Sequence, residues 1–372
     1  MNKSCMKIAL VHDYLNQYGG AERVLEVLLE LFPKADLYTI FHDAEKTKNR
    51  FQNRVTKTSF LDFPLARNRH RLFIPLMPLA AASLNLGSRY DLIISNTPGY
   101  AKGVRYDKKT TKHVSYIHTP IRYAWEAKDY LPALLSPFQL FIAEPVIDFL
   151  KWWDRRTAQN PNLILANSQH IAGKIKSCYG RDSTILYPPV DTKTFCYDSK
   201  SRKLKAKSYY LAVGRLLHYK RFDLIVDAFI KLGFPLKIVG IGTEQENLKI
   251  KIQNAKVSNI EMLGSVSDEE LKNLYNNAKA FIFPQVEDFG LVAAEAQSCG
   301  TPVIAYAAGG ALEIIQDGKT GLLFKEQTAG ALAAAVIKSA AIKFNRKTIA
   351  QSAQRFSKEK FTKNLQEMIA SV

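Results

Sequence analysis

Cysteine is scarce in this chain of 372 residues, and its spacing excludes two kinds of site. The four cysteines, Cys5, Cys178, Cys196 and Cys299, include no CxxC pair, and no histidine stands beside them at the spacing of zinc ligands. We therefore expect ordinary thiols in a reducing compartment, rather than a disulfide framework or a zinc site.

Long apolar runs are also missing. None reaches the roughly 18–20 residues that a helix needs to cross a bilayer. The first residues lead almost directly into Lys7-Ile8-Ala9-Leu10-Val11, a pattern typical of a strand, and not into a charged and then apolar leader with a cleavage site. We expect a cytoplasmic protein that either stays in solution or docks on a membrane without crossing it.

Acidic residues are outnumbered, with 34 Asp and Glu against 52 Lys and Arg, for a formal net charge of +18. Such a surplus fits an anionic partner, whether nucleic acid, an acidic membrane leaflet or a phosphorylated substrate. A generally Lys-rich composition would explain it without any partner. A nucleic-acid-binding protein would need a module with basic and aromatic residues on one face, and we find none.

Short β-rich apolar runs alternate with helical patterns along the chain, which predicts parallel sheets covered by helices. The expected strands are 8–11, 36–40, 92–95, 112–117 and 163–166 in the first half, and 209–213, 236–239, 260–263, 280–283 and 302–305 in the second. The apolar spacing after Gly20 predicts a helix with one buried face.

Two prolines interrupt this alternation in Tyr187-Pro188-Pro189-Val190-Asp191. Because proline lacks a backbone donor and favours extended structure, we place a connection between two domains here. We predict two doubly wound α/β domains, 1–187 and 188–354, with a closing helix over 355–372. Open α/β sheets bind ligands at the carboxyl ends of their strands, so we expect a cleft facing both sets of strand ends.

One motif of the second half suggests what is bound. Glu287-Asp288-Phe289-Gly290-Leu291 follows the strand 280–283, and Glu295 lies eight residues after Glu287. A helix opening near Gly290 would offer backbone N–H groups and its positive dipole end to a phosphate. Glu295 can then accept hydrogen bonds from a ribose, and Glu287 from a sugar. Two solvated carboxylates around a helix start are the simpler alternative.

Further motifs in a fixed order strengthen the first interpretation, because with them the chain resembles the retaining glycosyltransferases of family 4, which have the GT-B fold. The motifs are Gly19-Gly20-Ala21-Glu22, His118-Thr119-Pro120, Tyr187-Pro188-Pro189-Val190-Asp191, Gly214-Arg215-Leu216 through Lys220, Glu287-Asp288-Phe289-Gly290-Leu291 with Glu295, and Ala308-Gly309-Gly310. They span nearly the whole chain. The run 118–126, with 77–80 and 101–104, is similar to the branch of bacterial O-antigen and capsule mannosyltransferases.

The resemblance implies roles for the basic and acidic residues of the second half. Arg215 and Lys220 would clamp the donor diphosphate, whose negative charge grows as it leaves. Glu287 would act in catalysis by orienting the sugar, and Glu295 would hold the ribose. The rest of the donor site would come from Asp288, Phe289, Gly290 and Leu291. Without the motif, Arg215 and Lys220 would be two exposed cations of a basic protein.

The resemblance implies roles in the first half as well, each with a simpler alternative. Gly19 and Gly20 would bring backbone close to the donor, although a glycine pair can be only a turn. His118 would be catalytic, touching the donor sugar beside the reacting bond, although a lone histidine at a strand end is more often structural. Tyr123 and Trp125 would either stack on a sugar ring or belong to the core.

The resemblance further implies transfer of a hexose, with retention of configuration, from a nucleotide sugar to a lipid-linked glycan or polysaccharide in cell-surface glycan synthesis such as lipopolysaccharide. GDP-mannose is the favoured donor on the branch alone, ahead of UDP-hexoses. No Asp-x-Asp motif has a metal-binding setting, so we expect neither a metal nor a cofactor. The alternatives are a nucleotide-sugar 2-epimerase of the same architecture and a non-enzymatic nucleic-acid-binding protein.

A basic segment suggests where such an acceptor is met. Residues 46–71 hold eight Lys and Arg with Asp62 as the only acid, and they lead into an apolar stretch over 72–79. Cations beside an apolar stretch suit peripheral docking at the cytoplasmic face of the inner membrane. A solvated charged face beside a core helix is the competing explanation.

Overall fold

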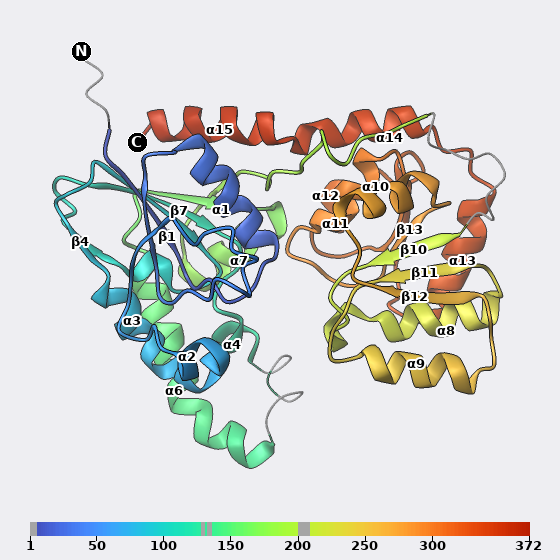
Figure 1. Cartoon of the computed structure of the whole chain (residues 1–372), viewed down its shortest axis with the longest axis horizontal. Helices are drawn as coiled ribbons and strands as arrows, with labels where there is room; N and C mark the ends of the chain where they lie inside the picture. Colours follow the sequence, from blue (N-terminus) through green and yellow to red (C-terminus); the bar gives the residue numbers. More distant parts are fainter. Residues whose placement is uncertain (1–5, 128–130, 132–135, 200–208) are drawn as a thin grey trace. The chain divides into compact units, whose positions relative to one another are not determined.

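The structure, a computed structural model, describes residues 6–127, 131, 136–199 and 209–372. Cys5 lies outside the described residues. The chain divides into two compact units, residues 1–187 with 362–372 (unit 1) and residues 188–361 (unit 2). Each unit contains a parallel sheet with helices around it, which confirms the predicted fold class (Figure 1).

The sheet of unit 1 has seven parallel strands in the order β3-β2-β1-β5-β7-β8-β9. Their bounds are β1 Ile8–His12, β2 Asp36–Thr39, β3 Val55–Thr58, β5 Leu92–Thr97, β7 Lys112–Ile117, β8 Leu163–Ala166 and β9 Thr184–Ile185. A small separate sheet pairs β4 Asn85–Gly87 with β6 Arg105–Tyr106. The edge strands β3 and β9 were not predicted, because the first is largely polar and the second has only two residues.

Eight helical elements surround the sheet of unit 1 among its described residues. They are α1 Gly20–Leu31, α2 Pro64–Asn68, η1 His70–Leu76, α3 Met77–Ser83, η2 Ala101–Gly103, α4 Arg122–Trp125, α6 Pro137–Thr157 and α7 Gln169–Tyr179. Helix α1 begins where the apolar spacing predicted it and buries Val24, Leu25 and Leu28. Gly180, at a φ of 70°, ends α7 in the left-handed conformation that glycine adopts most easily.

The sheet of unit 2 has six parallel strands in the order β12-β11-β10-β13-β14-β15. Their bounds are β10 Tyr210–Val213, β11 Leu236–Val239, β12 Ile260–Gly264, β13 Phe281–Phe283, β14 Val303–Tyr306 and β15 Gly321–Phe324. The helical elements are η3 His218–Lys220, α8 Phe222–Leu232, α9 Gln245–Asn254, α10 Asp268–Asn277, α11 Leu291–Ser298, α12 Ala311–Ile314, α13 Ala329–Ala340, α14 Arg346–Ala353 and η4 Gln354–Phe356, and α15 Lys358–Ala370 begins in this unit and ends in unit 1.

The core of unit 2 follows from the apolar pattern of its strands and helices. The strand β10 is buried along its whole length between β11 and β13, as expected of a strand covered on both faces. Helix α8 contributes Phe222, Ile225 and Phe229 to the same cluster, at a spacing that places them on one side of the helix. Helices α8 and α9 cover one face of the sheet, and α10, α11 and α12 lie over the other (Figure 1).

The closing helix begins three residues later than expected. Residues 354–356 form the short turn η4, and the Ser357 hydroxyl then accepts a hydrogen bond from Lys360 N at 3.3 Å. This is how an N-cap residue starts a helix, so α15 begins at Lys358.

Residues up to 361 belong to unit 2 and the last eleven to unit 1. Among the described residues, no helix is long and apolar enough to cross a bilayer.

Candidate functional site

In unit 1, His118 lies beside an asparagine that accepts a hydrogen bond from its ring. His118 follows β7, and its Nε2 is 2.7 Å from Oδ1 of Asn96 at the end of β5. The Nδ2 of Asn96 donates to the carbonyl of Ala21 at 2.8 Å, so Oδ1 is the acceptor toward His118. Nε2 of His118 therefore carries the proton.

The same asparagine joins His118 to the start of helix α1. The Nδ1 of His12, at the end of β1, lies 2.9 Å from the carbonyl oxygen of Asn96 and 3.1 Å from its Nδ2, and its Nε2 lies 3.4 Å from Glu22 Oε1. The other carboxylate oxygen of Glu22 accepts from Gly19 N at 2.7 Å. A buried series of polar groups thus runs from the Gly19-Gly20 turn to His118.

Glu22 is ionised within this series. Burial alone would raise the pKa of its carboxyl, but the hydrogen bond and charge of His12, with backbone donors including Gly19 N, bring that pKa below its ordinary value. His12 Nε2 lies 3.4 Å from this carboxylate, behind the glycine turn.

Asp13 and Asp154 are both buried in unit 1, and both hold backbone in place. Asp13 accepts from Thr97 Oγ1 at 2.6 Å and from the backbone N–H groups of Tyr100 and Ala101 at 2.9 and 2.6 Å. Both of its oxygens are used, so it anchors the loop after β5.

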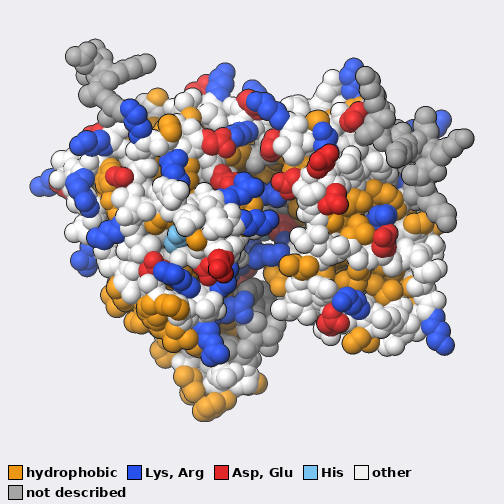
Figure 2. All heavy atoms as spheres, viewed as in Figure 1, with side chains coloured by type: hydrophobic (Ala, Val, Ile, Leu, Met, Phe, Trp, Pro, Cys, Tyr) orange, Lys and Arg blue, Asp and Glu red, His pale blue; other side chains and the backbone are white. Residues whose placement is uncertain are grey.

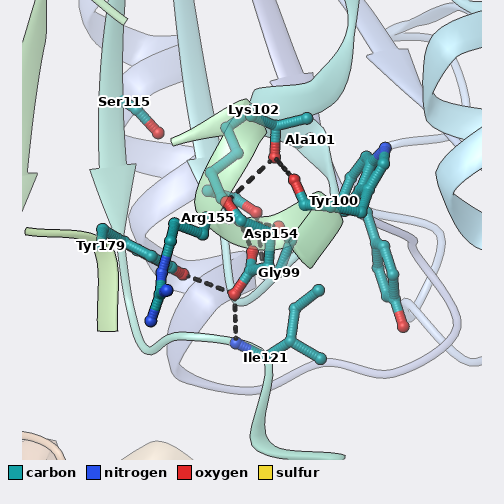
Figure 3. Close-up of polar contacts among 12 residues, drawn as sticks. Gly99, Tyr100, Ala101, Lys102, Ser115, Ile121, Asp154, Arg155 and Tyr179 are labelled. Carbon is teal, nitrogen blue, oxygen red and sulfur yellow. Dashed lines mark hydrogen bonds and ion pairs between the residues drawn. The ribbon is translucent and has the colours of Figure 1, made fainter. Parts of the chain in front are cut away.

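A second anchor fixes the segment after His118. Asp154 of α6 pairs with the fully buried Lys102 and accepts from Tyr179 OH at 2.8 Å and Ile121 N at 3.2 Å (Figure 3). It also accepts from Trp125 Nε1 at 2.8 Å. Trp125 packs against buried residues of two core clusters, which agrees with the core alternative for this residue.

In unit 2, Lys220 and Glu287 form an ion pair in which both side chains are largely buried. Lys220 ends η3, in the loop after β10, and Glu287 lies in the loop after β13. Because β10 and β13 are neighbours in the sheet, the two loops meet at its carboxyl edge. The structure thus brings together the predicted diphosphate cation and the predicted sugar carboxylate.

Arg215 stands on the same edge, exposed, with a guanidinium nitrogen 3.4 Å from the Tyr219 hydroxyl. The loop that carries Arg215 packs on the turn after β11, where Leu216 N donates to Ile241 O at 2.9 Å. A Cβ at Gly240 would lie 1.8 Å from Gly214 O. Only glycine permits this approach of the two loops.

The Ala308-Gly309-Gly310 turn after β14 packs directly on the backbone of the Glu287 loop. Gly310 N donates to Glu287 O at 2.9 Å. A Cβ at Gly309 would lie 2.4 Å from Glu287 O, and one at Gly310 would lie 2.1 Å from Phe289 O. The motifs quoted around positions 287 and 309 therefore form one structural group.

Helix α11 starts in this group, directly after Gly290, whose φ of 107° suits glycine alone. Leu291 is its first residue, and Asp288 is half-buried just before it. Phe289 points into the core against Phe356, so only its backbone faces the edge. Glu295 lies in the second turn and is 2% exposed, 3.5 Å from the Tyr275 hydroxyl.

The predicted residues thus fall into two groups, one in each unit. Gly19, Gly20 and His118 are joined through side chains in unit 1, and Arg215, Lys220, 287–291 and Glu295 gather at one sheet edge in unit 2. Sequence reasoning missed His12, Asn96 and the Lys102–Asp154 pair. A signal that could have found His12 and Asn96 is that each directly follows a predicted strand, 8–11 or 92–95. Within the described ranges, no group of His, Cys, Asp and Glu has the arrangement of metal ligands.

Family models match both halves of the chain. Residues 18–194 match the model described as Glycosyltransferase Family 4, and residues 197–360 match the model described as Glycosyl transferases group 1. Together these stretches leave few residues unmatched.

Individual relatives match a smaller part of the chain than the two family models together. An uncharacterized glycosyltransferase of Methanocaldococcus jannaschii is 26% identical over 210 residues, which are 56% of this chain and 58% of that protein. A GDP-mannose-dependent α-(1-6)-phosphatidylinositol monomannoside mannosyltransferase of Mycobacterium tuberculosis is 30% identical over 205 residues, covering 49% and 53%. The chain spans about half the length of the curated relatives it matches.

The fold is shared along nearly the whole chain with a solved structure. The Anabaena protein HepE, crystallised with UDP, superposes with a TM-score of 0.72 over 99% of this chain and 100% of that one, at 21% identity. This likeness shows the GT-B fold. Since the two halves match these two models, the chain consists of a glycosyltransferase family 4 domain followed by a glycosyl transferases group 1 domain.

Proposed function

We propose that this chain is a retaining hexosyltransferase, which moves a hexose from a nucleotide sugar to a lipid-linked glycan or polysaccharide. The observation that carries the proposal is the Lys220–Glu287 pair at the carboxyl edge of β10 and β13. A sugar diphosphate bound there meets a cation suited to its phosphate and a carboxylate suited to its sugar hydroxyls. Parallel α/β sheets bind ligands at this edge.

The diphosphate is held by groups of two loops, those after β10 and β13. Lys220 supplies a point charge, and Arg215 supplies a planar fork that can bind two oxygens. The start of α11 adds backbone N–H groups and the positive end of the helix dipole. These groups favour the transition state because the leaving diphosphate gains charge there. Since fixed cations meet the diphosphate, transfer needs no divalent metal and no cofactor.

The remaining roles concern the sugar and the acceptor. Glu287 and His118 orient the sugar, Glu295 holds the ribose, and the Gly19-Gly20 turn brings backbone N–H groups toward the donor. None of these carboxylates is assigned as a nucleophile. The acceptor hydroxyl therefore attacks from the face that the leaving group departs from, and the diphosphate takes its proton. The configuration at the sugar is retained.

Mannose from GDP-mannose is the hexose we propose first. The name of the mycobacterial relative, a GDP-mannose-dependent mannosyltransferase, supports this choice. The solved structure with UDP makes UDP-hexoses the next candidates. The acceptor is proposed to be met at the cytoplasmic face of the inner membrane, where a lipid-linked glycan would be displayed.

A thermal-shift screen with GDP-, UDP-, ADP- and dTDP-sugars tests the proposal, because a ligand that binds only the folded state raises its melting temperature. We expect one class of donor to raise the melting temperature of the wild type and not that of Lys220→Ala. Incubation of that donor with membrane extract should then label a glycan. Release of free epimerised sugar, without transfer, would replace the proposal with the epimerase alternative.

A further inference from the structure

Helix α6 exposes a row of large apolar side chains that its own core does not use. Phe138, Phe141, Ile142, Phe149 and Trp152, which we call the α6 stripe, are each 43–72% exposed. At 100° per residue they share one side of the helix. A surface helix normally keeps polar residues on its outward side.

A second apolar set lies on neighbouring elements of the same unit. Leu65 of α2, Leu72 and Leu76 of η1 and Leu79 of α3 are also exposed. Inward-facing side chains of η1, α3 and α6 belong to one core cluster, so these elements are packed together. Figure 2 shows the apolar side chains gathered over α2, α3 and α6 as one patch. Large contiguous patches of this kind mark interaction sites.

The patch carries cations among its apolar residues. Arg69 and Arg71 are exposed and stand between Leu65 and Leu72 in the chain. On α6, Arg156 lies over the Trp152 ring at 5.7 Å.

The acids of α6 lie elsewhere on the helix. Exposed Glu144 and Asp148 follow an adjoining strip with Lys151 and Arg155, where Asp148 pairs with Lys151 at 3.6 Å. The border of the stripe on α6 thus carries both signs, and the positive charge within the patch comes from Arg69, Arg71 and Arg156.

The basic segment 46–71 is less available for docking than its composition suggested. Lys46 pairs with Asp43, Arg50 with Glu26 and Arg67 with Asp62. Arg54 donates to the carbonyl of Pro33. Half of its eight cations are thus bound to their own unit, and the apolar patch becomes the stronger docking element.

We propose that the α6 stripe, with the exposed leucines of α2, η1 and α3, docks the chain on an anionic lipid bilayer, with α6 lying in the plane of the interface. The lipid-linked acceptor assigned above is what makes a bilayer the relevant partner, so the proposal rests on the proposed function. Phe, Trp and Leu enter the region between headgroups and acyl chains, while Arg side chains bind lipid phosphates. From Phe138 to Trp152 the stripe is about 21 Å long.

A second copy of the chain fits this patch less well than a bilayer. In a symmetric dimer the same patch meets itself, which would bring the arginines of one copy toward those of the other. Like charges brought together in an interface are unfavourable. Anionic headgroups instead neutralise the same cations.

Vesicle sedimentation with the full chain tests the proposal. The test variant is Phe138→Glu/Ile142→Glu, and the control is Ile337→Glu on α13, where the isoleucine is 58% exposed against 59% for Ile142. We expect the wild type and the control to sediment with vesicles of phosphatidylethanolamine and phosphatidylglycerol. The test variant should bind at least about tenfold more weakly. Arg69→Ala/Arg71→Ala should bind these vesicles more weakly than the wild type, and its binding should depend less on the phosphatidylglycerol content.

Three outcomes would overturn the proposal: no sedimentation of the wild type, equal sedimentation of the test and control variants, or a wild-type dimer that the test variant converts to a monomer without vesicle binding. Melting temperatures and donor-sugar thermal shifts of the variants should equal those of the wild type. A wild type that binds vesicles but no nucleotide sugar would defeat the proposed function and leave the docking surface standing.

Discussion

Asn96 determines which nitrogen of His118 carries the proton. Its amide is fixed in orientation by the carbonyl of Ala21, and its Oδ1 lies 2.7 Å from His118 Nε2. The Nδ1 of His12 lies 3.1 Å from the Nδ2 of the same asparagine and 2.9 Å from its backbone carbonyl oxygen. One buried side chain therefore links the ends of β1, β5 and β7 with the start of α1.

Replacing Asn96 by Asp should change the pH profile of transfer. A carboxylate beside an imidazole favours the charged ring, and it also loses the donor to Ala21. We expect kcat to fall about 10–100-fold at neutral pH and to recover partly as the pH rises and the ring loses its extra proton. Rate profiles of Asn96→Asp and Asn96→Ala check this. A uniform loss at every pH in both variants would make Asn96 merely structural.

Removing either member of the Lys220–Glu287 pair should abolish most of the turnover without unfolding the protein. Lys220→Ala loses a fixed cation at the leaving diphosphate, and Glu287→Ala loses the group assigned to orient the sugar. Each should cost roughly 10²–10³-fold in kcat, the usual cost of one preorganised electrostatic group. Steady-state kinetics with circular dichroism measure both effects. Near wild-type turnover in either variant would refute the assignment.

The Lys102–Asp154 pair should matter for stability. Both side chains are fully buried, and Asp154 also binds Tyr179, Trp125 and the backbone of Ile121. Asp154→Ala leaves an unpaired buried ammonium, so we expect a loss of about 3–5 kcal/mol in the free energy of unfolding. The double variant Lys102→Met/Asp154→Ala should lose less than the single one. Urea unfolding measures the free energy of unfolding of both variants. If the loss in the double variant equals the sum of the losses from the separate substitutions, Lys102 and Asp154 are not coupled.

Folding stability should fall in acid because of His113. Burial, with the charges of Lys108 and Lys102, lowers the pKa of this histidine from 6.5 to about 3. The unfolded chain binds its proton near pH 6.5 and the folded chain only near pH 3. Stability is therefore lost as the pH falls between these values, by up to about 1.4 kcal/mol per pH unit. Urea unfolding of His113→Gln should show a shallower dependence, and an unchanged slope would contradict this.

Most strands that sequence reasoning located are buried central strands, and the exception is the edge strand β12, predicted at 260–263. Residues 112–117, 163–166 and 236–239 form strands with the predicted bounds, because continuous apolar runs identify central parallel strands. The edge strand β15 was missed although it is apolar, since its glycine start and the preceding turn obscured it. Motif order located Lys220 and Glu287, but no local pattern shows that they touch. Asn96 is one of three successive polar residues, Ser95-Asn96-Thr97, at the end of β5, and only the register of β1 and β5 gives it a role.

Calorimetric titration of GDP and UDP into the wild type, Lys220→Ala and Lys237→Ala tests the diphosphate site most directly. Lys237→Ala is the control. Lys237 also forms an ion pair in unit 2, with Glu261 at 3.0 Å, but it lies within β11 and not in the loops at the carboxyl edge of the sheet. One nucleotide should bind the wild type and Lys237→Ala alike, and Lys220→Ala at least about tenfold more weakly, as expected for a lost charged hydrogen bond. Equal affinity in all three proteins, or no binding of either nucleotide, would contradict the account.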